Sequence, residues 1–237
     1  MISRKDRKSM ADHPYDETRK KNQPLSRNLF ARVEEDILTG KLASGSKLSE
    51  KKICDEYNVS RTPVRETMMR LEAEGLVETI PNRGAFVSGL SGRDVGDLAD
   101  MKNSMEILAV RWAIQRITEE ELEQLSETYD YMVFYTRTND LAKMMEINMN
   151  FHRIIHAAAH DRILQHMLDR FQRYSRYTQP EIYSGGYLEE VLEEHKAIYQ
   201  AFITHDPEAG VLAMQQHNRN TGRRIADIHL QNARTEQ

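Results

Sequence analysis

The sequence has little cysteine and no long apolar segment. Cys54 is the only cysteine among 237 residues, which excludes an internal disulfide and any cysteine-based metal or redox motif. No segment approaches the ~18 to 20 consecutive apolar residues of a membrane helix. The charged N-terminus also lacks the apolar region of a signal peptide. We therefore predict a soluble, cytoplasmic protein with no membrane partner.

Charge and histidine content change near residue 90. Residues 1–90 contain 17 Lys and Arg against 14 Asp and Glu, whereas residues 91–237 contain 16 against 23. Eight of the nine histidines follow residue 150. This shift predicts two domains, of which the basic one is the candidate for a polyanion partner. Residues 1–23 resemble a flexible basic arm, and an appended non-native segment or a plain disordered tail is the alternative.

The predicted first domain, residues 24–90, has the pattern of a small helical domain with a terminal hairpin. The apolar spacing predicts helices over 25–38, 51–57 and 60–74, then strands over 76–80 and 85–87. Asn58 tolerates the left-handed conformation and can turn the chain sharply between the second and third helices. Three helices with this turn and a hairpin predict a winged helix-turn-helix.

The outer face of the third predicted helix suits DNA recognition. Arg61 and Arg65 are four residues apart and share one side, where a guanidinium can bind guanine through two hydrogen bonds. Arg83 lies at the tip of the wing, and Lys51 at the start of the second helix can bind a phosphate. Each charge considered alone could simply be solvated. The predicted DNA-binding residues are Lys51, Ser60, Arg61, Thr62, Arg65, Asn82, Arg83 and Gly84.

Three segments carry a family resemblance: Val59–Glu66, Arg70–Val77 and Arg83–Val87. They closely resemble the DNA-binding domain of the GntR family of bacterial transcriptional regulators. The resemblance covers about residues 25–90 and implies a double-stranded DNA operator as the partner. Asn58 stands where the family commonly has Gly, and Lys51 where it often has Arg, and either departure could alter specificity.

After residue 92 the sequence pattern predicts only helices. The expected helices cover about 94–117, 118–138, 139–160, 163–178, 188–204 and 206–229. Short loops join them, which favours an antiparallel all-α bundle, the kind of fold that builds ligand and metal sites between facing helices. The predicted fold class is therefore mainly α, with a winged helix-turn-helix followed by this bundle over residues 91–237.

Three histidines and one asparagine are predicted to converge inside the bundle. Asn148 and His152 are four residues apart and stack on one helix face. His195 lies 11 residues before Asp206 and His217 lies 11 after it, so an antiparallel hairpin turning at Asp206 sets the two rings level. Three imidazoles and an amide oxygen suit a borderline divalent ion such as Zn, Ni or Co, and we predict Zn or Ni.

The second domain also resembles a known family. Asn148–His152, Glu194–Ile198 and His217 are similar to the FCD effector domain of the FadR subfamily of GntR regulators, in which one acidic or amide residue and three histidines hold a metal. The resemblance implies an effector-binding and dimerisation domain, and about six helices favour the shorter, VanR-like arm. FCD domains more often have Asp where this chain has Asn148, which puts the affinity and identity of the metal in question.

Several further residues are candidates for the effector pocket. Lys102 lies on an apolar stripe where FCD domains often have Arg, so its ammonium can pair with an effector carboxylate or extend to water. Arg170 and Tyr174 are additional effector candidates. His156 and His160 continue the stripe of His152 and could compete as metal ligands, although His160 also suits a helix end.

The leading hypothesis is a homodimeric transcription factor, usually a repressor, that a small organic acid controls by binding at the metal. Dimerisation is expected because a two-fold protein reads both halves of a symmetric operator. One alternative is a metal sensor in which the ion is the signal. The other is a metal-dependent hydrolase, but the sequence has no HExxH motif, nucleophile elbow or phosphate loop, so we predict no enzyme and no catalytic residues.

Overall fold

The computed structural model describes residues 25–178 and 187–235, with side chains described over 28–175 and 187–227. The chain divides into two compact units, Met1–Leu90 and Ser91–Gln237. The predicted basic arm, residues 1–23, lies outside the described residues. Each unit is considered by itself below.

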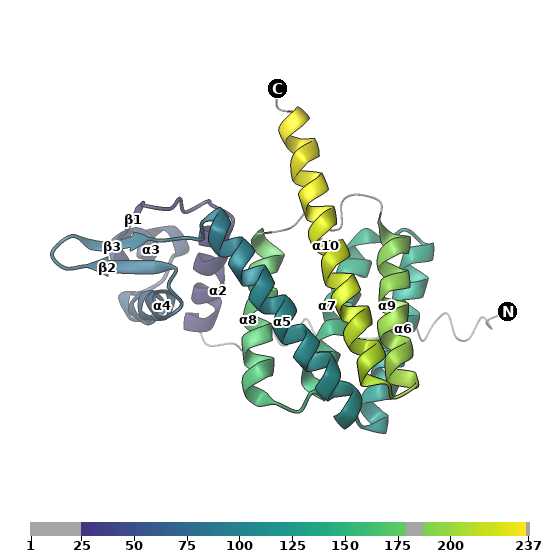
Figure 1. Ribbon diagram of the computed structural model, residues 1–237. Helices are drawn as coiled ribbons and strands as arrows, with labels where there is room; N and C mark the ends of the chain where they lie inside the picture. Colours follow the sequence, from purple (N-terminus) through teal and green to yellow (C-terminus); the bar gives the residue numbers. More distant parts are fainter. Residues whose placement is uncertain (1–24, 179–186, 236–237) are drawn as a thin grey trace. The chain divides into compact units, whose positions relative to one another are not determined.

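From residue 25 on, where the structure describes it, the first unit contains three helices and a three-stranded sheet (Figure 1). Its elements are α2 (Leu25–Leu38), β1 (Lys47–Leu48), α3 (Glu50–Tyr57), α4 (Arg61–Ala73), β2 (Val77–Ile80) and β3 (Gly84–Val87). The strand order is β1-β3-β2 and both pairings are antiparallel. The predicted fold is confirmed, but β1 was missed, because two residues are too few to show alternation and their pairing with β3 depends on tertiary packing.

The turn before α4 has the predicted left-handed residue. Asn58 has φ 53° and ψ 54°, and its backbone N–H donates to the Cys54 carbonyl. This turn lets Ile53 of α3 and Val64 of α4 both enter the core, where they are 1% and 0% exposed. Cys54, next to Ile53, is half-buried. The outer face of α4 is consequently left in solvent.

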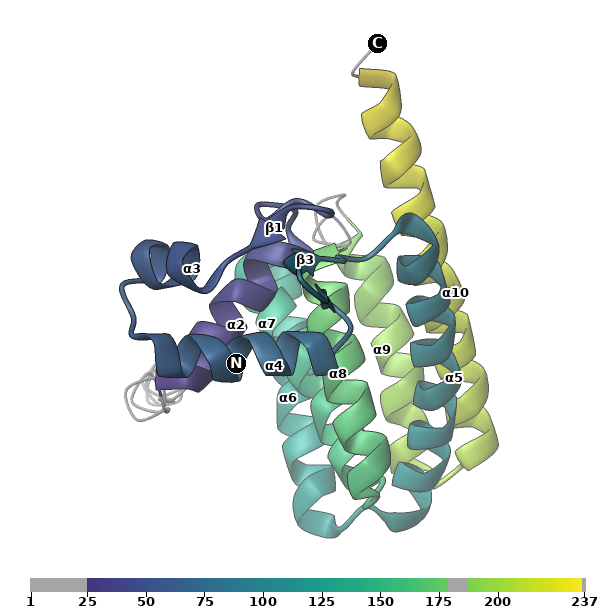
Figure 2. The same cartoon turned by 90° about the vertical axis from the view of Figure 1, so that its left-hand side faces the viewer.

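The second unit is an antiparallel bundle of helices (Figures 1 and 2). Its helices are α5 (Gly92–Arg116), α6 (Glu119–Arg137), α7 (Leu141–Ala158), α8 (Arg162–Thr178), α9 (Leu188–Ile203) and α10 (Pro207–Thr235). A capping box of Thr118 and Glu121 opens α6. None of the described helices is long and apolar enough to cross a membrane.

The core of the bundle is formed by apolar side chains from all six helices. Phe151 and Phe202 are fully buried, in the same cluster as Met132. At Gly210, α10 comes so close to α5 that an added Cβ atom would lie 2.3 Å from Ile114 Cδ1. Glycine therefore lets α10 approach α5 here while the Ile114 side chain keeps its position, and a larger residue would force the end of that side chain to shift.

Candidate DNA-binding and metal sites

The candidate DNA-reading residues lie at the exposed N-terminal end of α4. Arg61, Thr62 and Arg65 are all exposed, as is Ser60 at the N-cap position, whose side chain makes no capping hydrogen bond. Arg65 Nε donates to Glu50 Oε1 at 2.9 Å, in a pair with both side chains largely in solvent. Such a pair contributes only ~0 to 1 kcal/mol, so a base or phosphate can replace it at little cost.

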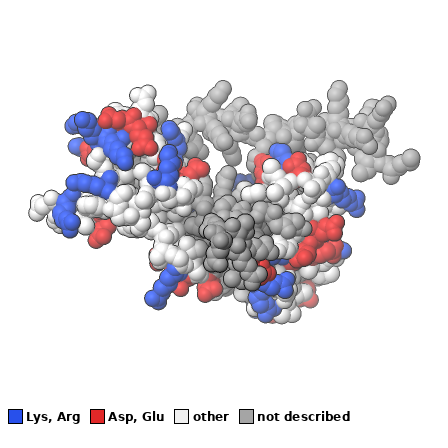
Figure 3. Space-filling model, turned by 90° about the horizontal axis from the view of Figure 1, so that it is seen from above, with Lys and Arg blue, Asp and Glu red and all other residues white. Residues whose placement is uncertain are grey.

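The wing places the predicted residues at the tip of the β2–β3 hairpin. Asn82 and Gly84 have φ values of 60° and 101°, and Arg83 between them is exposed. An added Cβ atom at Gly84 would lie 3.1 Å from Cε of Lys47, an exposed basic residue that sequence analysis missed. Lys and Arg side chains gather on this unit, at the left of Figure 3, together with some acidic ones. Lys51 is exposed at the start of α3.

Three histidines from three helices meet inside the bundle. The ring centroid of His152 on α7 lies 5.2 Å from those of His195 on α9 and His217 on α10, and the latter two are 4.7 Å apart. One nitrogen from each ring lies within 4.8 Å of the others, and all three side chains are buried. The rings of His195 and His217 lie side by side on adjacent helices, as their equal distance from the turn at Asp206 predicts.

Acceptors outside the cluster orient two of its three rings. His195 Nδ1 lies 2.7 Å from the Val191 carbonyl oxygen, and His217 Nδ1 lies 2.9 Å from Glu194 Oε2. Because these oxygens only accept, each Nδ1 carries the proton and each Nε2 presents a lone pair. His152 Nε2 lies 3.2 Å from His195 Nε2. Without an ion, His152 Nε2–H can donate to His195 Nε2 across this distance. The outer acceptors thus leave Nε2 of His195 and His217 unprotonated, the arrangement that prepares histidines for a metal.

Burial keeps two of these rings neutral. Loss of hydration, reinforced by the neighbouring His217, lowers the pKa of His195 to about 3. Burial likewise holds the pKa of His152 well below its usual range. Since a metal binds the neutral imidazole, both rings are ready to bind an ion at neutral pH without first losing a proton.

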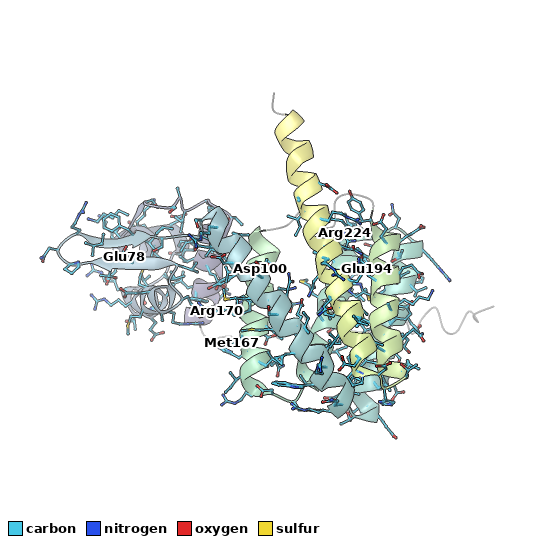
Figure 4. The ribbon with its side chains drawn as sticks, in the orientation of Figure 1. Glu78, Asp100, Met167, Arg170, Glu194 and Arg224 are labelled. Atoms are coloured by element: carbon cyan, nitrogen blue, oxygen red, sulfur yellow. The ribbon has the colours of Figure 1, made fainter. Side chains whose placement is uncertain are left out.

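Glu194 and Arg224 support the cluster and were missed by sequence analysis. Figure 4 shows the two side chains on adjacent α9 and α10. Arg224 donates to both carboxylate oxygens at 2.7 and 2.9 Å, and Asn220 donates to one at 2.7 Å. Burial alone raises the pKa of Glu194, but hydrogen bonds from Arg224, His217 and Asn220 lower it to about 2. The spacing of His217, Asn220 and Arg224 along one face of α10 was the available signal.

Comparison with known proteins covers both units. Residues 25–87 match the family model described as bacterial regulatory proteins, gntR family, and residues 97–220 match that of the FCD domain. The chain belongs to the GntR family. Its helical unit is an FCD domain, and proteins of this kind are DNA-binding transcription factors rather than enzymes. The hydrolase hypothesis is therefore set aside.

Several relatives of this GntR protein are regulators over nearly their whole length. The HTH-type transcriptional repressor RspR of Escherichia coli K12 is 26% identical over 220 residues, 89% of this chain and 93% of the relative. The galactonate operon transcriptional repressor of the same strain is 25% identical over 214 residues, 81% of this chain and 93% of the relative. The solved structure of E. coli McbR/YncC shares the fold, with a TM-score of 0.68 and 18% identity over 87% of this chain and 99% of that one.

The FCD domain contains a cavity of about 130 Å³ beside the histidines. Asn148 and Lys102, both predicted, line this cavity. Lys102 Nζ donates to Glu106 Oε2 at 2.8 Å, so its ammonium is already paired with a buried carboxylate that sequence analysis missed. Burial raises the pKa of Glu106, but Lys102 and the nearby His156 and His152 hold it well below its usual range. Glu106 is therefore charged.

Two predicted effector residues lie outside the cavity wall of the FCD domain. Gln172 and Ser175 line the cavity on α8, and Arg170 and Tyr174 do not. Arg170 Nε instead donates to Tyr174 Oη at 3.2 Å, on another face of the helix. The physical reason is that the packing of α8 on its neighbours, not the residue types along it, selects the face that meets the cavity.

His160 lies apart from the three-histidine cluster. Its Nε2 is 3.1 Å from Glu121 Oε2, and its φ of 48° marks the end of α7. His156 is buried beside Glu106, one helical turn from His152, and belongs to a second group of potential ligands.

Proposed function

We propose that this GntR regulator is a homodimeric repressor whose affinity for operator DNA is controlled by a small organic acid bound at a divalent metal. The observation that supports the proposal best is the convergence of ring nitrogens from His152, His195 and His217 inside the bundle. Without an ion, the His152 and His195 rings can share one hydrogen bond between their Nε2 atoms, 3.2 Å apart. A divalent ion would instead use a ring nitrogen of all three buried histidines at once.

The donor set fits Zn or Ni. Three neutral imidazoles suit a borderline divalent ion, and the Asn148 side chain lines the cavity next to them and can supply an oxygen. Four protein donors leave coordination positions open on a five- or six-coordinate ion. When bound, the metal supplies a positive centre that attracts a carboxylate, while Glu194 and Val191 hold two of the rings in place.

The cavity suits a small polar acid. A volume of about 130 Å³ corresponds to roughly four waters at ~30 Å³ each, enough for a short organic acid. Asn103, Gln172, Ser175 and Thr221 line it with amides and hydroxyls that can bind hydroxyl groups. The related galactonate operon repressor makes sugar acids the first compounds to test.

The proposed dimer is supported by exposed apolar side chains on α5 and α8, two helices that pack against each other. Met101 and Leu108 on α5, and Ile163 and Met167 on α8, are 40 to 65% exposed. Clustered large apolar residues of this kind mark protein interfaces. Ile163→Glu should shift the protein toward monomer in sedimentation analysis, whereas Leu212→Glu, on exposed α10 surface, should not.

The decisive experiment measures DNA and acid binding on the same protein. A duplex selected by the protein from a random pool serves as the operator, and a panel of sugar acids and short hydroxy acids serves as effectors. We expect acids to weaken operator binding by metal-loaded protein and to have no effect on chelator-stripped protein. By thermodynamic reciprocity, the operator should weaken acid binding by the same factor.

Two results would change the proposal. Acid binding that persists without metal would remove the metal from effector recognition. A change in operator affinity on adding metal alone, with no further effect of any acid, would identify a metal sensor instead.

A further inference from the structure

A second group of potential ligands adjoins the three-histidine cluster. Glu106 Oε1 on α5 lies 3.5 Å from His152 Nδ1 and 3.6 Å from His156 Nε2 on α7. Potential ligand atoms of these three residues all lie within 4.8 Å of one another, and Glu106 and His156 are both only 1% exposed. His152 belongs to both groups and offers a different ring nitrogen to each.

Hydrogen bonding does not account for this group. N–H···O hydrogen bonds usually measure ~2.7 to 3.2 Å, shorter than either contact to Glu106. Among the described residues, His152 Nδ1 and both ring nitrogens of His156 are buried without a hydrogen-bond partner. A neutral imidazole must carry one N–H, and the acceptor beside His156 is Glu106 Oε1, 3.6 Å from its Nε2 and too far for a well-formed hydrogen bond. Such a group in a well-packed core calls for an explanation.

The spacing instead suits a metal ion. Ligands held tetrahedrally at ~2.0 to 2.2 Å from Zn are about 3.3 to 3.6 Å apart, the separation seen here. Lys102 Nζ donates to Glu106 Oε2, and the other carboxylate oxygen, Oε1, faces the two histidines. The two contacts to Glu106 are too long for hydrogen bonds, but they match the distance between two ligand atoms bound to one tetrahedral ion.

We propose that Glu106, His152 and His156 hold a second divalent cation, and that His152 bridges the two ions through Nδ1 and Nε2. This inference rests on the proposed metal at His152, His195 and His217. The bridging ring gives up its Nδ1 proton to solvent as the second ion binds. The resulting imidazolate shares its negative charge between the two ions, and the Glu106 carboxylate adds a second anionic ligand to the second ion. Zn²⁺ and Co²⁺ suit this nitrogen and oxygen donor set.

The bridged pair has a functional consequence. The second ion would sit against Glu106, whose other oxygen is held by Lys102 at the cavity wall. Occupancy of the second position would therefore weaken the hold of Glu106 on the Lys102 ammonium and make that ammonium available to an acid in the cavity. Acid affinity should then rise with the second equivalent of metal rather than with the first alone.

The test uses the full chain loaded with Co²⁺. We expect two ions per chain by elemental analysis, and magnetic coupling between them in electron paramagnetic resonance. His156→Gln should retain one ion and lose the coupling, and Glu106→Gln should do the same. His166→Gln, the matched change at an exposed histidine on α8, should retain both ions and their coupling.

The outcomes separate this inference from the proposed function. The unaltered protein could hold a single ion that His195→Ala loses and His156→Gln keeps. That result would overturn the second site and leave the first. No ion in the unaltered protein would overturn both. Coupling in the unaltered protein supports the bridge directly, even if a buried variant does not fold.

Discussion

The candidate DNA-binding side chains of the first unit are exposed and spread over α3, α4 and the wing, whereas the candidate ligands of the FCD domain are buried and meet within 4.8 Å. Exposed groups that do not touch act nearly independently, so each contributes a modest share of affinity. Buried groups that share one centre act as a unit, and loss of one leaves the others incompletely satisfied. Substitutions in the two regions should therefore differ in size and in additivity.

The largest effect is expected at His195. Loss of a ring in His195→Ala should lower metal affinity by more than the ~10- to 100-fold typical of changes outside the coordination shell. Adding His152→Ala should cost little more, because the first change already breaks the site. Elemental analysis after dialysis measures the loss, and His160→Ala should keep its metal because His160 pairs with Glu121. Full occupancy in His195→Ala would contradict the assignment.

Next in size is the recognition helix. Arg65→Ala should weaken the selected operator by ~1 to 3 kcal/mol and relax its sequence preference, since a base contact is lost. Combining it with Arg83→Ala should give nearly the sum of the two losses, unlike the histidine pair. Fluorescence anisotropy on operator and scrambled duplexes provides the measurement. Equal losses on both duplexes would exclude a base-reading role for Arg65.

Glu194→Gln tests whether a residue that supports the histidine cluster from outside affects metal affinity. The amide can still bond His217 but no longer carries the charge that Arg224 and the ring stabilise, so metal affinity should fall by ~10- to 100-fold. Metal titration against a competing chelator detects the change. Glu193→Gln, at the exposed neighbour, should leave the affinity unaltered; a similar loss there would point to a general charge effect instead.

The smallest effect is expected at Lys51. A phosphate contact carries no sequence information, so Lys51→Ala should weaken all duplexes alike and reduce the slope of log affinity against log salt by about 1. Binding isotherms at several salt concentrations check this expectation. A loss confined to the selected operator would place Lys51 among the base-reading residues.

Sequence predicted the elements well and the site in part, for a physical reason. Helical spacing and turn residues are local, so the bundle, the Asn58 turn and the level placement of His195 and His217 could be read from the chain. The histidine partners of Glu106 and the Glu194 partner of Arg224 could not, because these partners lie on other helices; for Arg224 the sequence offered only its place on the same face of α10 as His217. The two-residue strand β1 and the cavity-facing side of α8 likewise depend on packing, which spacing along one element does not encode.

The lone thiol has a practical consequence for measuring the proposed switch. Cys54 is half-buried on α3, next to Ile53 of the DNA-binding core. A probe of suitable size attached there would label each chain once without any substitution, and a two-copy assembly would then contain a single pair of spin labels. Pulsed dipolar spectroscopy on that pair would report the separation of the two DNA-binding units, with and without acid, as a distance distribution in solution.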